Sequence, residues 1–77
     1  MSKAVPGKVF RHYKDPNKTY EIIKVVEGQP GLLNTVTYKQ LYTSEDYPQG
    51  TLWVRLKGEF EGVVIKDGIV LERFSPV

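Results

Sequence analysis

Residues 63–71 decide the fold class, and they read Val63-Val64-Ile65-Lys66-Asp67-Gly68-Ile69-Val70-Leu71. Two runs rich in β-branched residues flank an Asp-Gly pair. Asp-Gly is strongly favoured in a type I′ turn, because both central residues of that turn need a positive φ. The stretch therefore predicts an antiparallel hairpin, with strands at 63–66 and 69–74.

The rest of the chain repeats this pattern of short β-branched or aromatic runs between turn residues. No long segment has apolar residues spaced three and four apart, as an amphipathic helix requires. The runs predict four further strands, at residues 8–13, 19–27, 35–42 and 51–55.

Two of the connections have recognisable chemistry. Residues 14–18 read Lys-Asp-Pro-Asn-Lys, which favours a turn and predicts that the first two strands form a hairpin. Residues 57–62 favour a single helical turn with Phe60 packed beneath it. With no repeat and no linker, the 77 residues predict one all-β domain, 1–77. Five to six short antiparallel strands must curl into a small barrel to bury one face.

The composition narrows the chemistry available to the chain. There are no cysteines and only one histidine, and the net charge is +2. Without cysteine there are no disulfides, thiolate metal sites or cysteine nucleophiles, and a small secreted domain would normally need such crosslinks. No segment approaches the roughly 20 apolar residues of a membrane-spanning helix, and the N-terminus has no apolar signal region. We therefore expect a cytoplasmic protein with no cofactor and no membrane association.

An ordered series of residues along the chain resembles a known family. The series is Gly7, Arg11-His12-Tyr13-Lys14, Tyr20-Glu21-Ile22, Val36, Tyr38, Leu41, Tyr42, Leu52-Trp53-Val54-Arg55, Phe60, Gly68 and Arg73-Phe74. It is similar to the bacterial family called domain of unknown function 1653. The resemblance implies an SH3-like β-barrel and no activity or ligand. One departure is Leu56, which stands where the family typically has proline after Trp-x-Arg and so loses the fixed φ of the proline ring.

Six residues form the candidate ligand-binding patch. Strand alternation separates Arg11 and Tyr13 from Phe10 and His12, and separates Trp53 and Arg55 from Leu52 and Val54. Guanidinium groups beside aromatic rings suit the capture of a phosphate or carboxylate together with stacking. The predicted outward patch is Arg11, Tyr13, Tyr38, Tyr42, Trp53 and Arg55.

The competing interpretation is structural, and the small size of the core favours it. In that interpretation Trp53 and the tyrosines fill the barrel, because large rings supply most of the buried area of so small a domain. Arg55 is then a hydrogen-bond donor to Glu21 or to loop carbonyls.

Metal binding and catalysis receive little support from the sequence. His12 is the only histidine, so a site with several histidines is impossible. The acidic residues Glu45, Asp46, Glu59 and Glu61 fall in predicted connections without spaced ligand partners, which indicates a solvated rim and no metal site. No serine lies in a nucleophile-elbow context. We expect His12 to be structural, with one ring nitrogen bonded to the backbone.

Three functions remain open at this point. The first is a noncatalytic binding module that presents the candidate patch to an extended peptide or a single-stranded nucleic acid. The second is a structural or assembly protein that forms a homo-oligomer through a strand edge or an aromatic face. The third, a small acid-base enzyme using His12 with Glu21 or Arg55, ranks last, so we expect no enzymatic activity.

Overall fold

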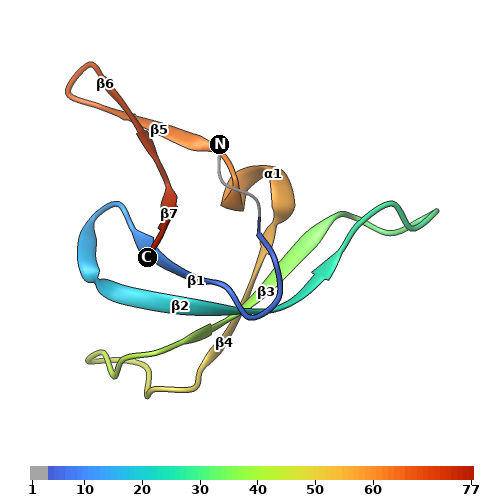
Figure 1. Ribbon diagram of the computed structural model, residues 1–77, viewed down its shortest axis with the longest axis horizontal. Coiled ribbons are helices and arrows are strands. Elements are labelled where there is room, and N and C mark those ends of the chain that lie inside the picture. Colours follow the sequence, from blue (N-terminus) through green and yellow to red (C-terminus); the bar gives the residue numbers. More distant parts are fainter. Residues whose placement is uncertain (1–3) are drawn as a thin grey trace.

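The computed structural model describes residues 4–77, so the first three residues of the predicted domain lie outside it. Its strands form a five-stranded antiparallel sheet, ordered β4-β3-β2-β1-β7, and a separate two-stranded ribbon, β5-β6 (Figure 1). The elements are β1 (Val9–His12), β2 (Asp15–Val26), β3 (Thr35–Gln40), β4 (Leu52–Leu56), α1 (Lys57–Phe60), β5 (Val63–Lys66), β6 (Ile69–Glu72) and β7 (Phe74–Pro76). The prediction of an all-β fold is confirmed.

The predicted C-terminal hairpin is present as the β5-β6 ribbon. Lys66 pairs with Ile69 across the turn, and Asp67 and Gly68 have φ values of 53° and 78°. Both central residues therefore have the positive φ that a type I′ turn demands. Figure 1 shows the ribbon projecting away from the larger sheet.

The strand predicted at 69–74 is divided between the two sheets. β6 ends at Glu72, the chain bends at Arg73, and β7 pairs with β1 through contacts such as His12 with Phe74. The prediction of one continuous strand is wrong because Phe74 is buried in the core of the larger sheet while β6 stays on the ribbon. Sequence alternation cannot show where a chain changes sheets.

The first hairpin is also present, but its turn is shorter than predicted. His12 pairs with Asp15, which leaves Tyr13 and Lys14 as the turn, and the next pair is Arg11 with Thr19. Residues 16–18 therefore lie in a bulge within β2 instead of in the turn. The side chain of Asp15 accepts a hydrogen bond from the Asn17 N–H (2.9 Å), the local bond that makes such residues prominent in turns.

The strands do not close into the predicted barrel. β4 and β7 are the two outer strands of the five-stranded sheet, and β5 pairs with β6 alone among the described residues. α1 packs against β3 and β4, and it is the predicted helical turn with Phe60 beneath it. The Phe60 ring is buried against Phe74, with stacked ring centroids 4.1 Å apart.

Aromatic rings make up much of the core. Phe60 also packs edge-on against Phe10 at 5.3 Å and contacts Tyr38 at 5.2 Å. Such pairs contribute roughly 0.5–1.5 kcal/mol each beyond the area they bury. The buried hydrophobic residues are Ala4, Phe10, Tyr20, Ile22, Val36, Tyr38, Phe60 and Phe74.

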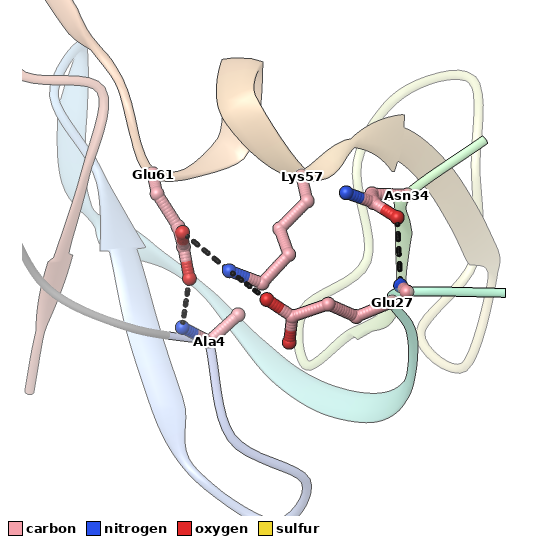
Figure 2. Close-up of polar contacts among 6 residues, drawn as sticks. Ala4, Glu27, Asn34, Lys57 and Glu61 are labelled. Atoms are coloured by element: carbon pink, nitrogen blue, oxygen red, sulfur yellow. Dashed lines mark hydrogen bonds and ion pairs between the residues drawn. The ribbon is translucent and has the colours of Figure 1, made fainter.

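A polar network ties the N-terminal segment and the β2-β3 connection to α1 (Figure 2). Glu61 accepts hydrogen bonds from the Ala4 N–H and from the Lys57 ammonium, both at 2.8 Å. Lys57 also pairs with Glu27 at 3.4 Å. The hydrogen bond to Glu61 raises the pKa of Lys57, which favours its charged form in the folded protein.

Candidate functional site

The first candidate site is a cavity of about 170 Å³ on the inner face of the sheet. Tyr38 and Trp53 are cross-strand partners, as are Val36 and Arg55, so these side chains share the face that carries the core. We call it the Arg55 cavity. It is lined by His12, Tyr20, Tyr38, Trp53, Arg55 and Phe74.

Arg55 is held by neutral groups. Its Nε donates to the Tyr38 hydroxyl at 3.4 Å, and its guanidinium carbon lies 5.8 Å from the centre of the Phe74 ring. Glu21, one suggested partner, pairs instead with Lys39 at 3.5 Å. Among residues 4–77 no carboxylate forms an ion pair with Arg55, so its charge is not neutralised within the described part of the chain.

Trp53 is fixed by a buried amide. Its indole Nε1 donates to the Gln40 side-chain oxygen at 3.1 Å. The Gln40 amide nitrogen donates in turn to the carbonyls of Tyr42 and Tyr47, at 2.8 and 3.1 Å. The Tyr47 ring packs edge-on against the indole, with centroids 4.7 Å apart. The sequence analysis missed Gln40, although its alternation with Val36 and Tyr38 places it on the buried face.

The second candidate site is a cavity of about 310 Å³ beside the β1-β2 turn. We call it the Arg11 cavity, and it borders the ribbon through Leu71 and Glu72. Arg11 has no ion pair within residues 4–77. The lining residues are Arg11, His12, Tyr13, Pro16, Leu71, Glu72 and Ser75.

His12 lines both cavities. Its Nδ1 accepts a hydrogen bond from the Lys14 N–H at 3.2 Å, which confirms the predicted backbone bond. In the neutral ring the proton is then on Nε2. Partial burial lowers the pKa of His12, and the positive charges of Lys14, Arg55, Arg73 and Lys18 lower it further.

Tyr20 lines the Arg55 cavity, and its hydroxyl is hydrogen-bonded to the Tyr42 hydroxyl. Burial raises the pKa of Tyr20 well above its usual range, and the bond to Tyr42 raises it further. Tyr20 is therefore a neutral hydrogen-bonding group at physiological pH. Tyr42 packs against the core and is not part of the lining of either cavity.

The structure does not bring the six residues of the predicted patch together on one outward surface, and two of them have the opposite orientation to the one predicted. Trp53 and Arg55 point inward and are partly buried, whereas Leu52 and Val54 are the exposed side chains of β4. The prediction that Trp53 and Arg55 face outward is wrong because the inner face of β4 lies over the aromatic core.

Five of the six patch residues nevertheless line the two cavities: Tyr38, Trp53 and Arg55 line the first, and Arg11 and Tyr13 line the second. The sequence analysis missed Tyr20 and Phe74, and it gave His12 no binding role.

Within the described part of the chain, no cluster of three or more histidine or acidic side chains is placed to hold a metal ion. No helix of residues 4–77 is both long and apolar enough to cross a membrane.

A family model with the description "Protein of unknown function (DUF1653)" matches residues 8–76. The chain belongs to this family. The DUF1653 match confirms the resemblance drawn from the aromatic and arginine residues. No curated protein and no solved structure matches the chain. The departure from the DUF1653 pattern at Leu56 has little effect on the backbone, because Leu56 has a φ of −59°, close to the roughly −65° that proline imposes.

Proposed function

We propose that the protein is a noncatalytic binding module that takes a single-stranded nucleic acid across the Arg55 and Arg11 cavities. The observation that carries the proposal is that His12 lines both cavities and that each cavity has an arginine without an ion pair among residues 4–77. An extended ligand can therefore occupy both sites at once. One arginine is available at each site for an anionic group.

The charges around His12 favour a negatively charged ligand. Lys14, Lys18 and Arg73 act on the imidazole together with Arg55, whereas the ion pairs of Lys39 and Lys57 lie elsewhere. The Nε of Arg73 is buried and has no hydrogen-bond partner among the described residues. Arg73 lines neither cavity, so its contribution to an anionic ligand is the positive charge and not this buried nitrogen.

The size and lining of the Arg55 cavity favour a flat ring. Its volume is about 170 Å³, and an engineered apolar cavity of roughly 150 Å³ holds a benzene molecule. Aromatic walls suit a nucleobase, since stacking on aromatic side chains is worth roughly 1–3 kcal/mol per base. Arg55 would then take the phosphate next to that base.

The environment of His12 supports a role without catalysis. Its Nδ1 is occupied by the backbone N–H of Lys14, where a catalytic histidine is normally oriented by a carboxylate. Its lowered pKa leaves it uncharged near neutral pH.

We also propose that the fold is an open form of an SH3-like barrel, which the antiparallel strand order and the short helix before the last strands support.

The test is a titration of the protein with a short single-stranded pyrimidine oligonucleotide. Binding is monitored through the fluorescence of Trp53, the only tryptophan. The logarithm of the affinity should fall with the logarithm of the salt concentration, with a slope of about −0.7 for each phosphate contact. R55Q should weaken binding at least about tenfold, as expected for the loss of a charged hydrogen bond, and should reduce the slope by about 0.7.

The matched control is K66Q, which removes an exposed positive charge at the tip of the ribbon and should leave both affinity and slope unchanged. A neutral proline-rich peptide and an acidic tyrosine-containing peptide are titrated in parallel. Binding of a peptide without binding of the oligonucleotide would assign the module to peptides. An absence of binding to all three would refute the binding proposal.

A further inference from the structure

A second feature of the molecule lies outside both cavities, on the outer face of β4. Leu52, Val54 and Leu56 alternate along this strand, and their side chains are 58%, 66% and 43% exposed. β4 is an outer strand of the sheet. An exposed apolar edge of this kind is what most proteins avoid, because it pairs readily with another strand.

Most backbone groups of the same three residues are free to pair, the exception being the Leu56 C=O, which caps α1. Thr51 accepts from the Gln40 N–H at 2.9 Å, and the Lys57 N–H donates to Asn34 at 2.9 Å, so both residues bond toward β3. In an antiparallel ladder, alternate residues direct their N–H and C=O groups to opposite sides of the strand. The N–H and C=O of Leu52 and Val54 and the N–H of Leu56 therefore point away from β3, toward the open edge, whereas the Leu56 C=O accepts the first hydrogen bond of α1.

The opposite edge of the sheet is protected, and β4 is not. β7 has three residues, includes Pro76, and carries no exposed side chain. β4 has five residues with neither proline nor glycine, and its outward side chains carry no charge. Proline and charge on an edge strand block its pairing with another strand. β7 has such a proline, whereas β4 has neither a proline nor an outward charge.

The sequence of β4 is complementary to itself when read in the opposite direction. A two-fold axis through Val54 would place Val54 opposite Val54 and Leu52 opposite Leu56. On the inner face the same register would place Trp53 opposite Arg55 of the second copy, a cation-π pair. Every facing pair is then apolar with apolar or cation with ring, and no like charges meet.

We propose that two copies of this chain associate through antiparallel pairing of their β4 strands about an axis at Val54. Val54 of each copy exchanges both backbone hydrogen bonds with Val54 of the other, and the Leu56 N–H of each copy donates to the Leu52 C=O of the other. The occupant of the edge is a second copy because the register that satisfies the backbone also matches all three outward side chains. The backbone pairing uses the outer edge of β4, but its inner-face pairs use Trp53 and Arg55, which also line the Arg55 cavity.

Sedimentation velocity over a wide range of protein concentration tests the proposal. Five paired residues make a smaller interface than a typical stable complex, so the wild-type dimer should dissociate on dilution. The apparent mass should double between the lowest and highest concentrations. A wild-type protein that stays at the monomer mass throughout would overturn the proposal.

Charge complementation identifies the pairing partner and the register. V54K and V54E should each stay monomeric, because like charges then face each other across the axis. An equal mixture of the two variants should recover dimers, because Lys and Glu then face each other. Val54 is exposed, so both variants should fold, as circular dichroism will check. Failure of the mixture to associate when the wild type does would overturn the register.

Two further variants separate edge pairing from simple contact between apolar faces. L56P retains a φ that proline accepts, since Leu56 is at −59°, but it removes an outward N–H and should weaken the dimer. I65K makes an apolar-to-lysine change on the exposed ribbon and should leave the dimer intact. Loss of the dimer in I65K, or an unaffected dimer in L56P, would contradict pairing through β4.

Discussion

The five-stranded sheet and the β5-β6 ribbon contain the same kinds of residue and bury them very differently. In the sheet, Ile22 is 1% exposed and Val36 is not exposed at all, whereas in the ribbon Ile65 is 75% and Val70 is 62% exposed. Figure 1 shows the ribbon projecting away from the larger sheet, whereas Ile22 and Val36 lie in the aromatic-rich core of that sheet. Residue type favours a strand, but packing decides burial.

The two regions also differ in how their strands are brought together. The ribbon strands are joined by a two-residue turn, so their pairing is local. The larger sheet joins β1 to β7, residues more than sixty positions apart, and this pairing must offset a larger loss of chain entropy. We therefore expect the stability of the protein to depend on the sheet and its core, with the ribbon contributing little.

The largest loss in the free energy of unfolding is expected from a substitution in the core of the sheet. F60A removes a buried ring that stacks on Phe74 and contacts Phe10 and Tyr38. Truncation of a buried phenylalanine costs about 3–5 kcal/mol, a large share of the roughly 4–11 kcal/mol expected for a domain of this size. Urea denaturation followed by Trp53 fluorescence measures the change.

The matched ribbon variant is I65A, which removes an exposed side chain and should change the free energy of unfolding by no more than about 0.5 kcal/mol. A loss in I65A comparable to that in F60A would show that the ribbon is packed as the sheet is, and would remove the contrast between the two regions.

The next effect lies at the junction between α1 and the ribbon. A Cβ at Gly62 would lie 2.8 Å from the carbonyl oxygen of Gly58, so G62A forces the backbone to shift. Overpacking of this kind costs about 1–3 kcal/mol. G58A serves as the control, because its Cβ would meet nothing within 4 Å, and it should stabilise the protein by about 0.4–1 kcal/mol. Equal melting temperatures for the two variants would contradict this geometry.

A smaller effect confined to the ribbon is expected for G68A. Gly68 has a φ of 78°, and a left-handed conformation costs about 1–2 kcal/mol for a residue with a Cβ. Amide hydrogen exchange should become faster in β5 and β6 and should change little in β2 and β3. Acceleration spread evenly over both sheets would show that the ribbon unfolds only with the whole domain.

The smallest effect concerns pH, and it involves His12 beside the sheet. Because the pKa of His12 is lowered in the folded protein, the unfolded chain binds this proton more readily. His12 then contributes stability above its unfolded pKa of about 6.5, and this contribution is lost as pH falls through the folded value. In H12N the free energy of unfolding should depend less on pH between about 5 and 7. An unchanged pH dependence in H12N would assign the effect to other groups.

The sequence predicted several elements well because their causes are local. The Asp67-Gly68 turn, the strand at 63–66 and the position of Phe60 under a helical turn are all found as expected. The sequence did not predict the features that depend on contacts between residues far apart in the chain. The break at Arg73 depends on Phe74 reaching the core beside β1, and the inward direction of Trp53 depends on which face of β4 that core covers.

The all-β class, the family and the separation of Trp53 and Arg55 from Leu52 and Val54 follow from the amino-acid order alone, because alternation and turn chemistry are properties of neighbouring residues. Three further features emerge only in the folded chain: which of those two faces is buried, where the chain passes from ribbon to sheet, and the position of His12 in the lining of both cavities. Burial and cavities arise from side chains far apart in the sequence, and a period of two residues is the same whichever face turns inward.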